Sequence, residues 1–424
     1  MLLQFYFSNY RSFEGATTLD MRAGGSNELI SHVRIVGHDK VLPVAAIYGA
    51  NASGKSTVFS AFKFMTLYVV QSFYLSEDNK DRSTAIMPIK PFAMSDSRDK
   101  PSEFEVNYVI SQDGRERYIN YGFILEKNGV CEEWLKTNSK TGIARNKEYK
   151  TIFFRKRNQI MAHDTVLDRY MHNLEISLDD HVLLASLGAK LKVKELVDVR
   201  DWFLGNEPID CSSFIYDEFL SKRIAKGVIE GGTAMNRLLN FMHSFDDSIV
   251  DFEFKKNPKT EELGRETYQI FSFHKFNGSD ELIKIPLRDE SSGTIKMFSL
   301  FQILSDVNEK GSILFVDELD IKLHPLLMRN ILLTFTDSEK NPNNAQLIFT
   351  THNSVYLDMG LLRRDEIWFV EKIKNVSELY ALSDFIDPNG AKVRKDANYA
   401  KNYLLGHYGA VPILSSLFGD SRNE

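Results

Sequence analysis

The sequence predicts an α/β protein built on a largely parallel sheet, with an antiparallel N-terminal part and a mainly helical insertion. Three observations predict this class. From residue 295 onward, helical patterns alternate with short apolar runs, an order typical of parallel sheets. An apolar run at 41–48 leads through a glycine-rich loop into a helical pattern. Between residues 103 and 134, the turn signals Asp113-Gly114 and Asn128-Gly129 separate alternating stretches, which indicates an antiparallel meander.

Four parts are expected along the chain. Residues 1–134 and 249–381 are expected to form the two halves of one head, because apolar strands come from both ends of the sequence. Residues 135–248 are interpreted as a mainly helical insertion, as in "HVLLASLGAKLKVKELVDVRDWFL" at 181–204. Residues 382–424 form a tail.

Composition narrows the class of protein. The 424 residues include 43% hydrophobic and 26% charged side chains, with a net charge of −6; this does not indicate a globally basic nucleic-acid binder. The two cysteines, Cys131 and Cys211, support neither a disulfide framework nor a zinc site. The most apolar window, 58–73, is short and contains Lys63, so we expect a buried helix and no membrane span. With no targeting segment evident, we expect a cytoplasmic protein.

A phosphate-binding loop is predicted at residues 49–57. The stretch "GANASGKST" fits GxxxxGK[ST] and lies between an apolar strand and a helix. Backbone N–H groups would surround phosphate oxygens, Lys55 would reach the β and γ phosphates, and Ser56 would ligate Mg²⁺. The residues expected to bind the nucleotide are Gly49, Asn51, Ala52, Ser53, Gly54, Lys55, Ser56 and Thr57.

An acidic pair ends a later apolar run, in "SILFVDELDIKLHP" at 312–325. Asp317 is expected to hold the Mg²⁺ shell, and Glu318 to orient or deprotonate the attacking water. The pair lies 262 positions after Lys55 (317 − 55). A gap this wide suits a head whose two halves are split by an inserted arm.

A histidine follows the next apolar run, in "AQLIFTTHNS" at 345–354. Polar residues at the carboxyl ends of neighbouring parallel strands build a crevice site. We therefore expect His352 to contact the γ-phosphate or the attacking water.

These motifs together resemble the ABC-type ATPase heads of the SMC, RecF and double-strand-break-repair class. Within that class the chain is similar to bacterial RloA-like and abortive-infection ATPases, which are related to the ATPase half of OLD nucleases. The matching stretches occur in family order and reach from one end of the chain to the other. They are "NYRSF" at 9–13, "GANASGKST", "ESSGTIKM", "VDELDIKLHP", "TTHNS", "RRDEIWFVEK" and "NYLLGHYGAVP".

The resemblance implies further roles. Asp317 and Glu318 match the Walker B aspartate and the catalytic glutamate, Asp320 the loop at the dimer interface, and His352 the switch histidine. The signature motif, which binds the γ-phosphate held by a second head, aligns with Ser291, Ser292, Gly293 and Thr294; the first three are expected to contact the nucleotide.

The chain departs from the family pattern at several positions. Glu290 stands at the first signature position, and Ser292 replaces the first glycine. No glutamine occurs between 86 and 103, so the Q-loop is not assigned; Gln112 is interpreted as a turn residue. His407 stands where the family usually has arginine. The tail motif is interpreted either as docked on the head or as a partner contact.

The predicted function is ATP binding and hydrolysis with Mg²⁺ by a homodimer, or higher oligomer, of ATP-sandwiched heads. The first biological interpretation is a sensor ATPase of an anti-phage system that controls a separately encoded effector, since no second catalytic centre is visible. The alternative is a DNA-repair or DNA-clamping ATPase of the RecF or SMC type, with 153–159 and 190–200 as basic stretches for nucleic acid. A third reading, a non-catalytic scaffold, fits the complete set of motifs poorly.

Overall fold

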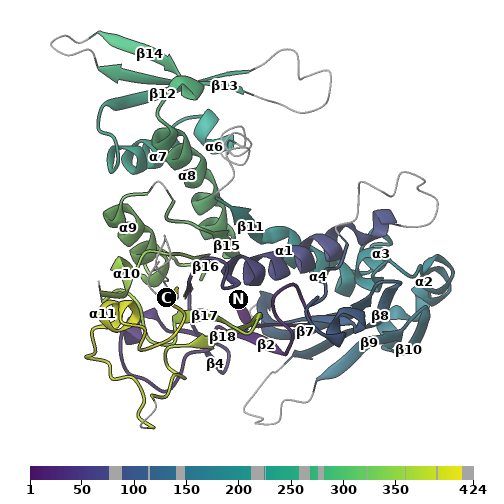
Figure 1. The fold of residues 1–424 in the computed structure, drawn as a ribbon. Helices are drawn as coiled ribbons and strands as arrows, with labels where there is room; N and C mark the ends of the chain where they lie inside the picture. The colour runs from purple at the N-terminus through teal and green to yellow at the C-terminus, as the bar shows by residue number, and fades with distance from the viewer. Residues whose placement is uncertain are drawn as a thin grey trace, which may run out of the picture.

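The computed structural model describes residues 1–75, 88–112, 115–139, 149–211, 224, 226–256, 268–275, 281–321, 323–358, 360–387 and 390–412. In these ranges the chain forms a mixed α/β protein, which confirms the predicted class (Figure 1). A parallel sheet lies at its centre, an antiparallel sheet extends to one side, and a small sheet stands beyond α7 and α8.

The antiparallel sheet has the strand order β10-β9-β8-β7-β6-β1-β2. Long strands β6, β7 and β8 form the meander expected from the alternating stretches. The turn between β7 and β8 consists of Lys127 and Asn128, one position before the predicted Asn128-Gly129, because Gly129 already pairs with Glu126 in β8. Asp113-Gly114 lies outside the described residues. The strands are β1 (Leu2–Ser8), β2 (Thr17–Asp20), β6 (Ser102–Gln112), β7 (Arg115–Glu126), β8 (Gly129–Ser139), β9 (Lys150–Lys156) and β10 (Gln159–His163).

The central sheet has the order β11-β15-β16-β5-β17-β18, and all its strands are parallel except β18. Its strands come from both ends of the chain, as predicted. They are β5 (Val44–Tyr48), β11 (Glu207–Asp210), β15 (Ile313–Asp317), β16 (Gln346–Thr350), β17 (Ile367–Ile373) and β18 (Val376–Ala381). Two smaller sheets pair β3 (Arg34–Val36) with β4 (Asp39–Val41), and β12 (Ile249–Lys256) with β13 (Tyr268–Lys275) and β14 (Leu282–Pro286).

The helices cover both faces of the central sheet. The α-helices are α1 (Lys55–Gln71), α2 (Met171–Ser177), α3 (Leu184–Lys190), α4 (Lys194–Gly205), α6 (Lys226–Ile229), α7 (Thr233–His243), α8 (Ser292–Lys310), α9 (Pro325–Thr336), α10 (Val355–Asp358) and α11 (Tyr399–Leu404). Short 3-10 helices are η1 (Ile30–His32), η2 (Ser72–Leu75), η4 (Asp96–Asp99), η5 (Thr165–Tyr170) and η7 (Leu287–Asp289). None of the helices in the described ranges is both long and apolar enough to span a membrane.

Strand β5 shows why the core has two parts. Ala45 and Ile47 point to the core that contains α1 and the antiparallel sheet. Val44, Ala46 and Tyr48 point to the core that contains α8, α9 and α11. Because side chains alternate along a strand and both faces are covered, the strand is apolar throughout. This burial fixes the strand ends on which the candidate site is built.

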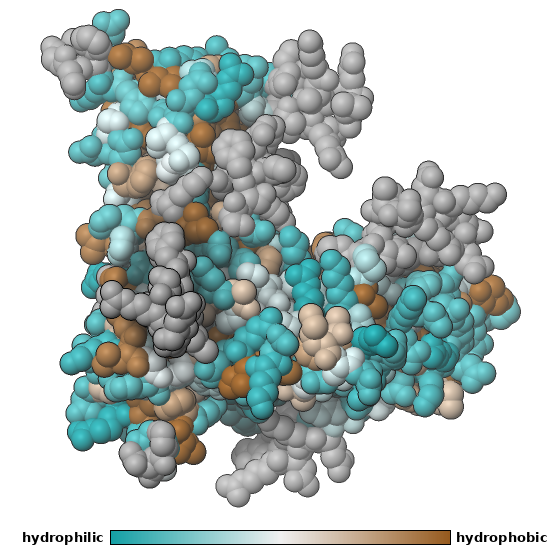
Figure 2. Space-filling view, viewed as in Figure 1, coloured by the Kyte–Doolittle hydropathy of each residue, from teal (hydrophilic) through white to brown (hydrophobic). Residues whose placement is uncertain are grey.

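The segment 135–248, expected to be mainly helical, contains strands as well as helices. Strands β9 and β10 continue the antiparallel sheet, and β11 joins the edge of the central sheet beside β15. Over the antiparallel part the surface is mostly hydrophilic, while hydrophobic side chains are more frequent along the column of α7, α8 and α9 (Figure 2).

Candidate nucleotide site

The loop between β5 and α1 has the backbone shape that the glycine pattern predicts. Gly49, Ala52 and Gly54 have φ angles of 155°, 61° and 120°. A Cβ atom on Gly54 would lie 2.6 Å from Ser377 Oγ and 2.9 Å from Ser12 Oγ, so glycine is required there by both conformation and space. Lys55 begins the 17-residue helix α1, and the N–H groups at this helix start are suited to an anion.

The Lys55 side chain is held at the loop by three acceptors. Its Nζ donates to the carbonyl oxygens of Gly49 at 2.8 Å and Ala50 at 3.0 Å, and lies 3.3 Å from His352 Nδ1. The residue is 5% exposed. Burial lowers the pKa of Lys55 to about 8, against the opposing effect of the neighbouring carboxylates. An anion placed at the loop would therefore meet a cation that is poorly solvated.

Asp317 and Ser56 lie together beside the loop. Thr350 Oγ1 donates to Asp317 Oδ1 at 2.5 Å, and the Ser56 hydroxyl lies close enough to influence the same carboxylate. Burial raises the pKa of Asp317, and the two hydroxyl groups act in the opposite direction.

A carboxylate and a hydroxyl oxygen in contact fit Mg²⁺, which takes few protein ligands and leaves the rest to water and phosphate. The described residues contain no cluster of three or more metal-binding side chains, so Mg²⁺ would need such additional ligands.

Glu318 and His352 face each other across the ends of β15 and β16. Glu318 Oε1 lies 3.4 Å from His352 Nε2. The backbone of Glu318 has φ 55°, and its N–H donates to Thr350 Oγ1 at 2.8 Å. A left-handed backbone at a non-glycine residue is costly and is frequent at functional sites. The geometry thus brings together Lys55, Asp317, Glu318 and His352.

The loop after the acidic pair is tied to helix α8. Thr351 Oγ1 donates to Asp320 Oδ2 at 2.9 Å, and burial raises the pKa of Asp320. Lys296, a buried residue of α8, contacts the carbonyl oxygens of Leu319 and Ile321. The signature helix and the loop that contains Asp320 are therefore linked by one side chain.

The signature residues lie apart from the phosphate loop. Ser291 caps α8, because its Oγ accepts the N–H of Thr294 at 3.1 Å. Ser292 is exposed, and a Cβ on Gly293 would lie 3.3 Å from the Phe245 ring. Within the described ranges, no hydrogen bond or ion pair joins these residues to residues 49–57.

Glu290 has a role that the sequence does not reveal. Its Oε1 lies 2.6 Å from His274 Nε2 and also accepts the hydroxyl of Ser272. Both partners belong to β13, so the residue before the signature is fixed to the small sheet. No local pattern marks this contact.

Ser12 and Ser377 both contact the loop, and neither of them is predicted from the sequence. Ser12 Oγ donates to Thr57 Oγ1 at 3.3 Å, and its carbonyl accepts the N–H of Ser377 at 2.8 Å. Ser377 Oγ donates to the carbonyl of Ser53 at 2.5 Å. Ser12 belongs to the "NYRSF" stretch, so this stretch contacts the phosphate loop. Sequence order alone gave no signal for Ser377.

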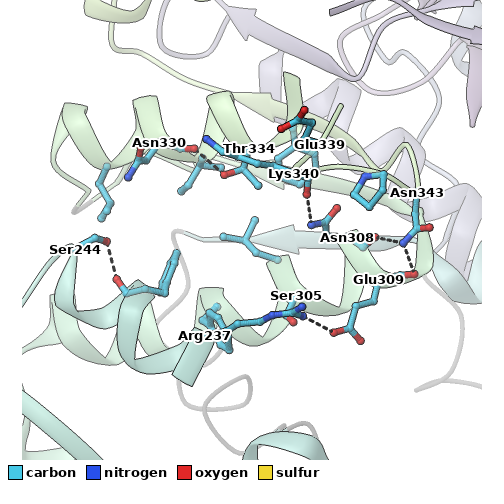
Figure 3. A pocket seen from close by; sticks show the side chains of 17 residues that line it. Arg237, Ser244, Ser305, Asn308, Glu309, Asn330, Thr334, Glu339, Lys340 and Asn343 are labelled. Carbon is cyan, nitrogen blue, oxygen red and sulfur yellow. Dashed lines mark hydrogen bonds and ion pairs between the residues drawn. The ribbon is translucent and has the colours of Figure 1, made fainter. Parts of the chain in front are cut away.

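A pocket of about 670 Å³ lies between α7, α8 and α9, away from these residues (Figure 3). Its apolar lining includes Phe241, Phe301, Leu327, Ile331 and Phe335. At its edge Arg237 pairs with Glu309 at 3.9 Å. None of the predicted nucleotide-site residues lines it. The pocket is therefore formed where α7, α8 and α9 meet and is separate from the candidate nucleotide site.

Comparison with known proteins gives one family. Residues 44–358, from β5 to α10, match the family described as "AAA domain, putative AbiEii toxin, Type IV TA system", and the chain belongs to this family. No curated protein matches the chain.

Solved SMC heads are similar at low identity. They include the SmcHead bound to the C-winged helix domain of ScpA (12% identity, TM-score 0.49, 90% of this chain and 97% of that chain). The SMC head domain from Thermotoga maritima is 15% identical (TM-score 0.42, 90% and 98%). The Pyrococcus furiosus Smc head domain bound to the C-terminal domain of ScpA is 13% identical (TM-score 0.46, 90% and 96%).

Proposed function

We propose that this member of the AbiEii-type AAA family binds ATP with Mg²⁺, hydrolyses it, and closes as a head-to-head dimer when ATP is bound. One observation carries the proposal: Lys55, Asp317, Glu318 and His352 meet at the carboxyl edge of parallel strands, although they are up to 297 positions apart in sequence. Such an edge, next to a phosphate loop, is where α/β proteins bind nucleotides.

Each residue has a part in hydrolysis that follows from its position. The loop N–H groups and Lys55 hold the phosphates, and Glu318 accepts a proton from the attacking water. His352 contacts both Glu318 and Lys55, so it can orient the carboxylate and report the presence of the γ-phosphate. Mg²⁺ held by Ser56 and Asp317 would neutralise charge on the phosphate oxygens.

The position of the signature supports the proposed dimer. Ser291 and Ser292 begin a 19-residue helix, whose N-terminus attracts anions. In the proposed dimer, a second copy brings its signature to the phosphate loop of the first. In a two-fold symmetric dimer each copy gives and receives the same contact. ATP then acts as the ligand that closes two heads, and its hydrolysis releases them.

The biological role proposed is that of a cytoplasmic sensor ATPase in an anti-phage system, acting on a separately encoded effector. The family description, which names a putative AbiEii toxin and a type IV TA system, supports a role in defence over a DNA clamp; control of a separate effector is part of the proposal. The basic stretch 153–159 gives the clamp little support. Arg155 is fully buried and Lys156 pairs with Glu132 at 3.3 Å.

Mixing two inactive variants tests the composite site. Lys55→Ala removes the phosphate contact, and Ser291→Arg blocks the signature, so each alone should lose hydrolysis. A 1:1 mixture should recover roughly a quarter of the wild-type rate, since half of the dimers are mixed and each holds one intact site of two. A mixture as inactive as its components overturns the head-to-head arrangement, and an inactive wild-type protein overturns hydrolysis.

The role is tested in cells and with DNA. In cells that carry the chain with its neighbouring genes, Glu318→Gln should abolish protection against phage. Strong stimulation of hydrolysis by DNA alone, with no effect on infection, would favour the DNA-clamping alternative instead.

A further inference from the structure

The tail motif is docked on the head, against the strand that leads into the phosphate loop. Tyr403 of α11 is buried. Its ring stacks on Phe369 of β17 at 5.3 Å and lies 6.1 Å from the ring of Tyr48. Tyr48 is the last residue of β5 and directly precedes Gly49. The tail therefore reaches the first residue of the loop.

The Tyr403 hydroxyl connects two segments. It donates to the carbonyl oxygen of Ala410 at 3.3 Å, and it faces the backbone N–H of Gly49, whose approach partly offsets the rise that burial causes in the pKa of Tyr403. The hydroxyl therefore keeps its proton at neutral pH and donates it to Ala410, while its oxygen is turned toward Gly49. A single hydroxyl thus joins the phosphate loop to the end of the tail motif.

The segment that receives this bond is itself fixed. Tyr380 OH donates to the carbonyl of Tyr408 at 2.6 Å. Gly409 has φ 67°, and a Cβ there would lie 2.7 Å from Glu371 Oε2 and 2.9 Å from Tyr380 OH. Ala410 has φ 57°. Since β17 and β18 hold this turn tightly, the carbonyl of Ala410 is a firm anchor for Tyr403.

Gly49 is confined from the other side as well. A Cβ on Gly49 would lie 2.4 Å from the carbonyl oxygen of Val370 in β17. The loop therefore begins between β17 and the tail. Tyr403 is uncharged and adds no charge to the site. The Gly49 carbonyl in turn accepts from Lys55 Nζ at 2.8 Å. Displacement of Gly49 would move the group that holds the phosphate-binding lysine.

We infer that Tyr403 is a positioning residue for nucleotide binding: its hydroxyl ties the first glycine of the phosphate loop to the tail motif and keeps the loop in the shape that receives phosphate. This inference rests on the proposed function. It gives "NYLLGHYGAVP" a role within its own head. It also predicts that a movement of the tail changes the affinity for ATP.

Tyr403→Phe tests the inference, because it keeps the ring contacts and removes only the hydroxyl. The KM for ATP should rise about threefold to tenfold, as expected for the loss of one or two hydrogen bonds, with kcat within about twofold. In nucleotide-free protein, hydrogen–deuterium exchange at the Gly49 amide should become about tenfold faster. Leu404→Ala, an exposed neighbour in α11, is the matched control and should change neither quantity.

The two readouts separate the two proposals. Exchange is measured without nucleotide, so faster exchange at Gly49 supports the link between Tyr403 and Gly49 whether or not the protein binds ATP. A wild-type protein that fails to bind ATP would overturn only the proposed function. Unchanged exchange in Tyr403→Phe overturns the inference. A lower melting temperature with unchanged KM and unchanged exchange also overturns it, because it shows a merely structural tyrosine.

Discussion

His352 Nε2 lies 3.4 Å from Glu318 Oε1, and this contact joins the ends of two adjacent parallel strands. The other ring nitrogen, Nδ1, lies 3.3 Å from Lys55 Nζ. Because an ammonium group can only donate, Nδ1 accepts and Nε2 carries the proton that faces Glu318. The imidazole therefore connects the cation that would hold phosphate with the carboxylate that would activate water.

Glu318→Gln should separate binding from hydrolysis. The amide keeps the size of the side chain but cannot take a proton, so hydrolysis should fall at least about 100-fold. Affinity for ATP should stay within about threefold, because Glu318 contacts no phosphate in the proposed complex. Phosphate release and mass photometry at saturating ATP should show a slow enzyme that accumulates dimers.

The exposed Glu339→Gln is the matched control and should behave as wild type. Hydrolysis at the wild-type rate in Glu318→Gln would show that another group activates the water.

Affinity for ATP should depend on the protonation of Lys55. Burial lowers its pKa to about 8 in the free protein, whereas phosphate oxygens favour the charged form. Binding then takes up a proton above this pH, so the dissociation constant should rise by up to about tenfold per pH unit above pH 8 and be flat from pH 7 to 7.5. Fluorescence titration with a labelled ATP analogue measures this.

Lys55→Arg is the informative comparison, because a guanidinium stays charged throughout this range. Its affinity should be lower than that of the wild type at neutral pH, but the slope above pH 8 should disappear. An equal slope in both proteins would assign the titration to another group.

Ser292→Gly should strengthen closure. Ser292 is exposed at the start of α8, where the resemblance places a glycine that lets the backbone approach phosphate. Removing the side chain should tighten the ATP-dependent dimer several-fold, at a cost of roughly 0.5–1 kcal/mol in the free energy of unfolding. Sedimentation in the Glu318→Gln background measures the dimer. A weaker dimer would show that the serine hydroxyl itself contributes to the contact.

Glu290→Leu should weaken the dimer without changing ATP binding by the single chain. Leucine is the residue of the transporter signature, yet here it would leave His274 and Ser272 without the carboxylate that they contact. The helix start would lose its tie to β13, and we expect about tenfold weaker dimerisation. Asp289→Asn, at an exposed neighbour, should have no effect. Equal dimerisation in all three proteins would contradict this role.

The sequence predicts the parts of the site that lie within one motif. The strand, loop and helix around Lys55 follow from local pattern, and the meeting of Asp317, Glu318 and His352 follows because neighbouring parallel strands end at one edge. The contacts of Glu290, Lys296 and Tyr403 do not, because they join distant segments through common polar side chains. Their partners are fixed only by the packing of whole elements.

The burial of Arg155 could have been predicted from the two-residue period of a strand. In the sequence Arg155 belongs to a basic stretch, which is interpreted as surface charge. In β9 it lies two residues after Phe153, and residues two apart share one face of a strand. Phe153 is buried, and so is Arg155.

Arg155→Met should destabilise the fold strongly. Arg155 lies 3.7 Å from the carboxylate of Glu133, and both side chains are fully buried. Glu133 also accepts the N–H of Leu184 at 2.6 Å and of Ala185 at 3.0 Å. Loss of the cation leaves a buried carboxylate uncompensated, and we expect a loss of roughly 3–5 kcal/mol in the free energy of unfolding at neutral pH. Urea denaturation measures it.

The pH dependence of this loss gives its cause. Burial raises the pKa of Glu133 above its ordinary value, and removal of Arg155 should raise it further. Folding then favours the protonated carboxyl, so the variant should lose stability as pH rises and recover part of its deficit between pH 8 and pH 5. Lys156→Met, an exposed neighbour that pairs with Glu132, should cost at most about 1 kcal/mol at either pH. A deficit in Arg155→Met as small as that of Lys156→Met, or one independent of pH, would show that the buried pair does not stabilise the fold in this way.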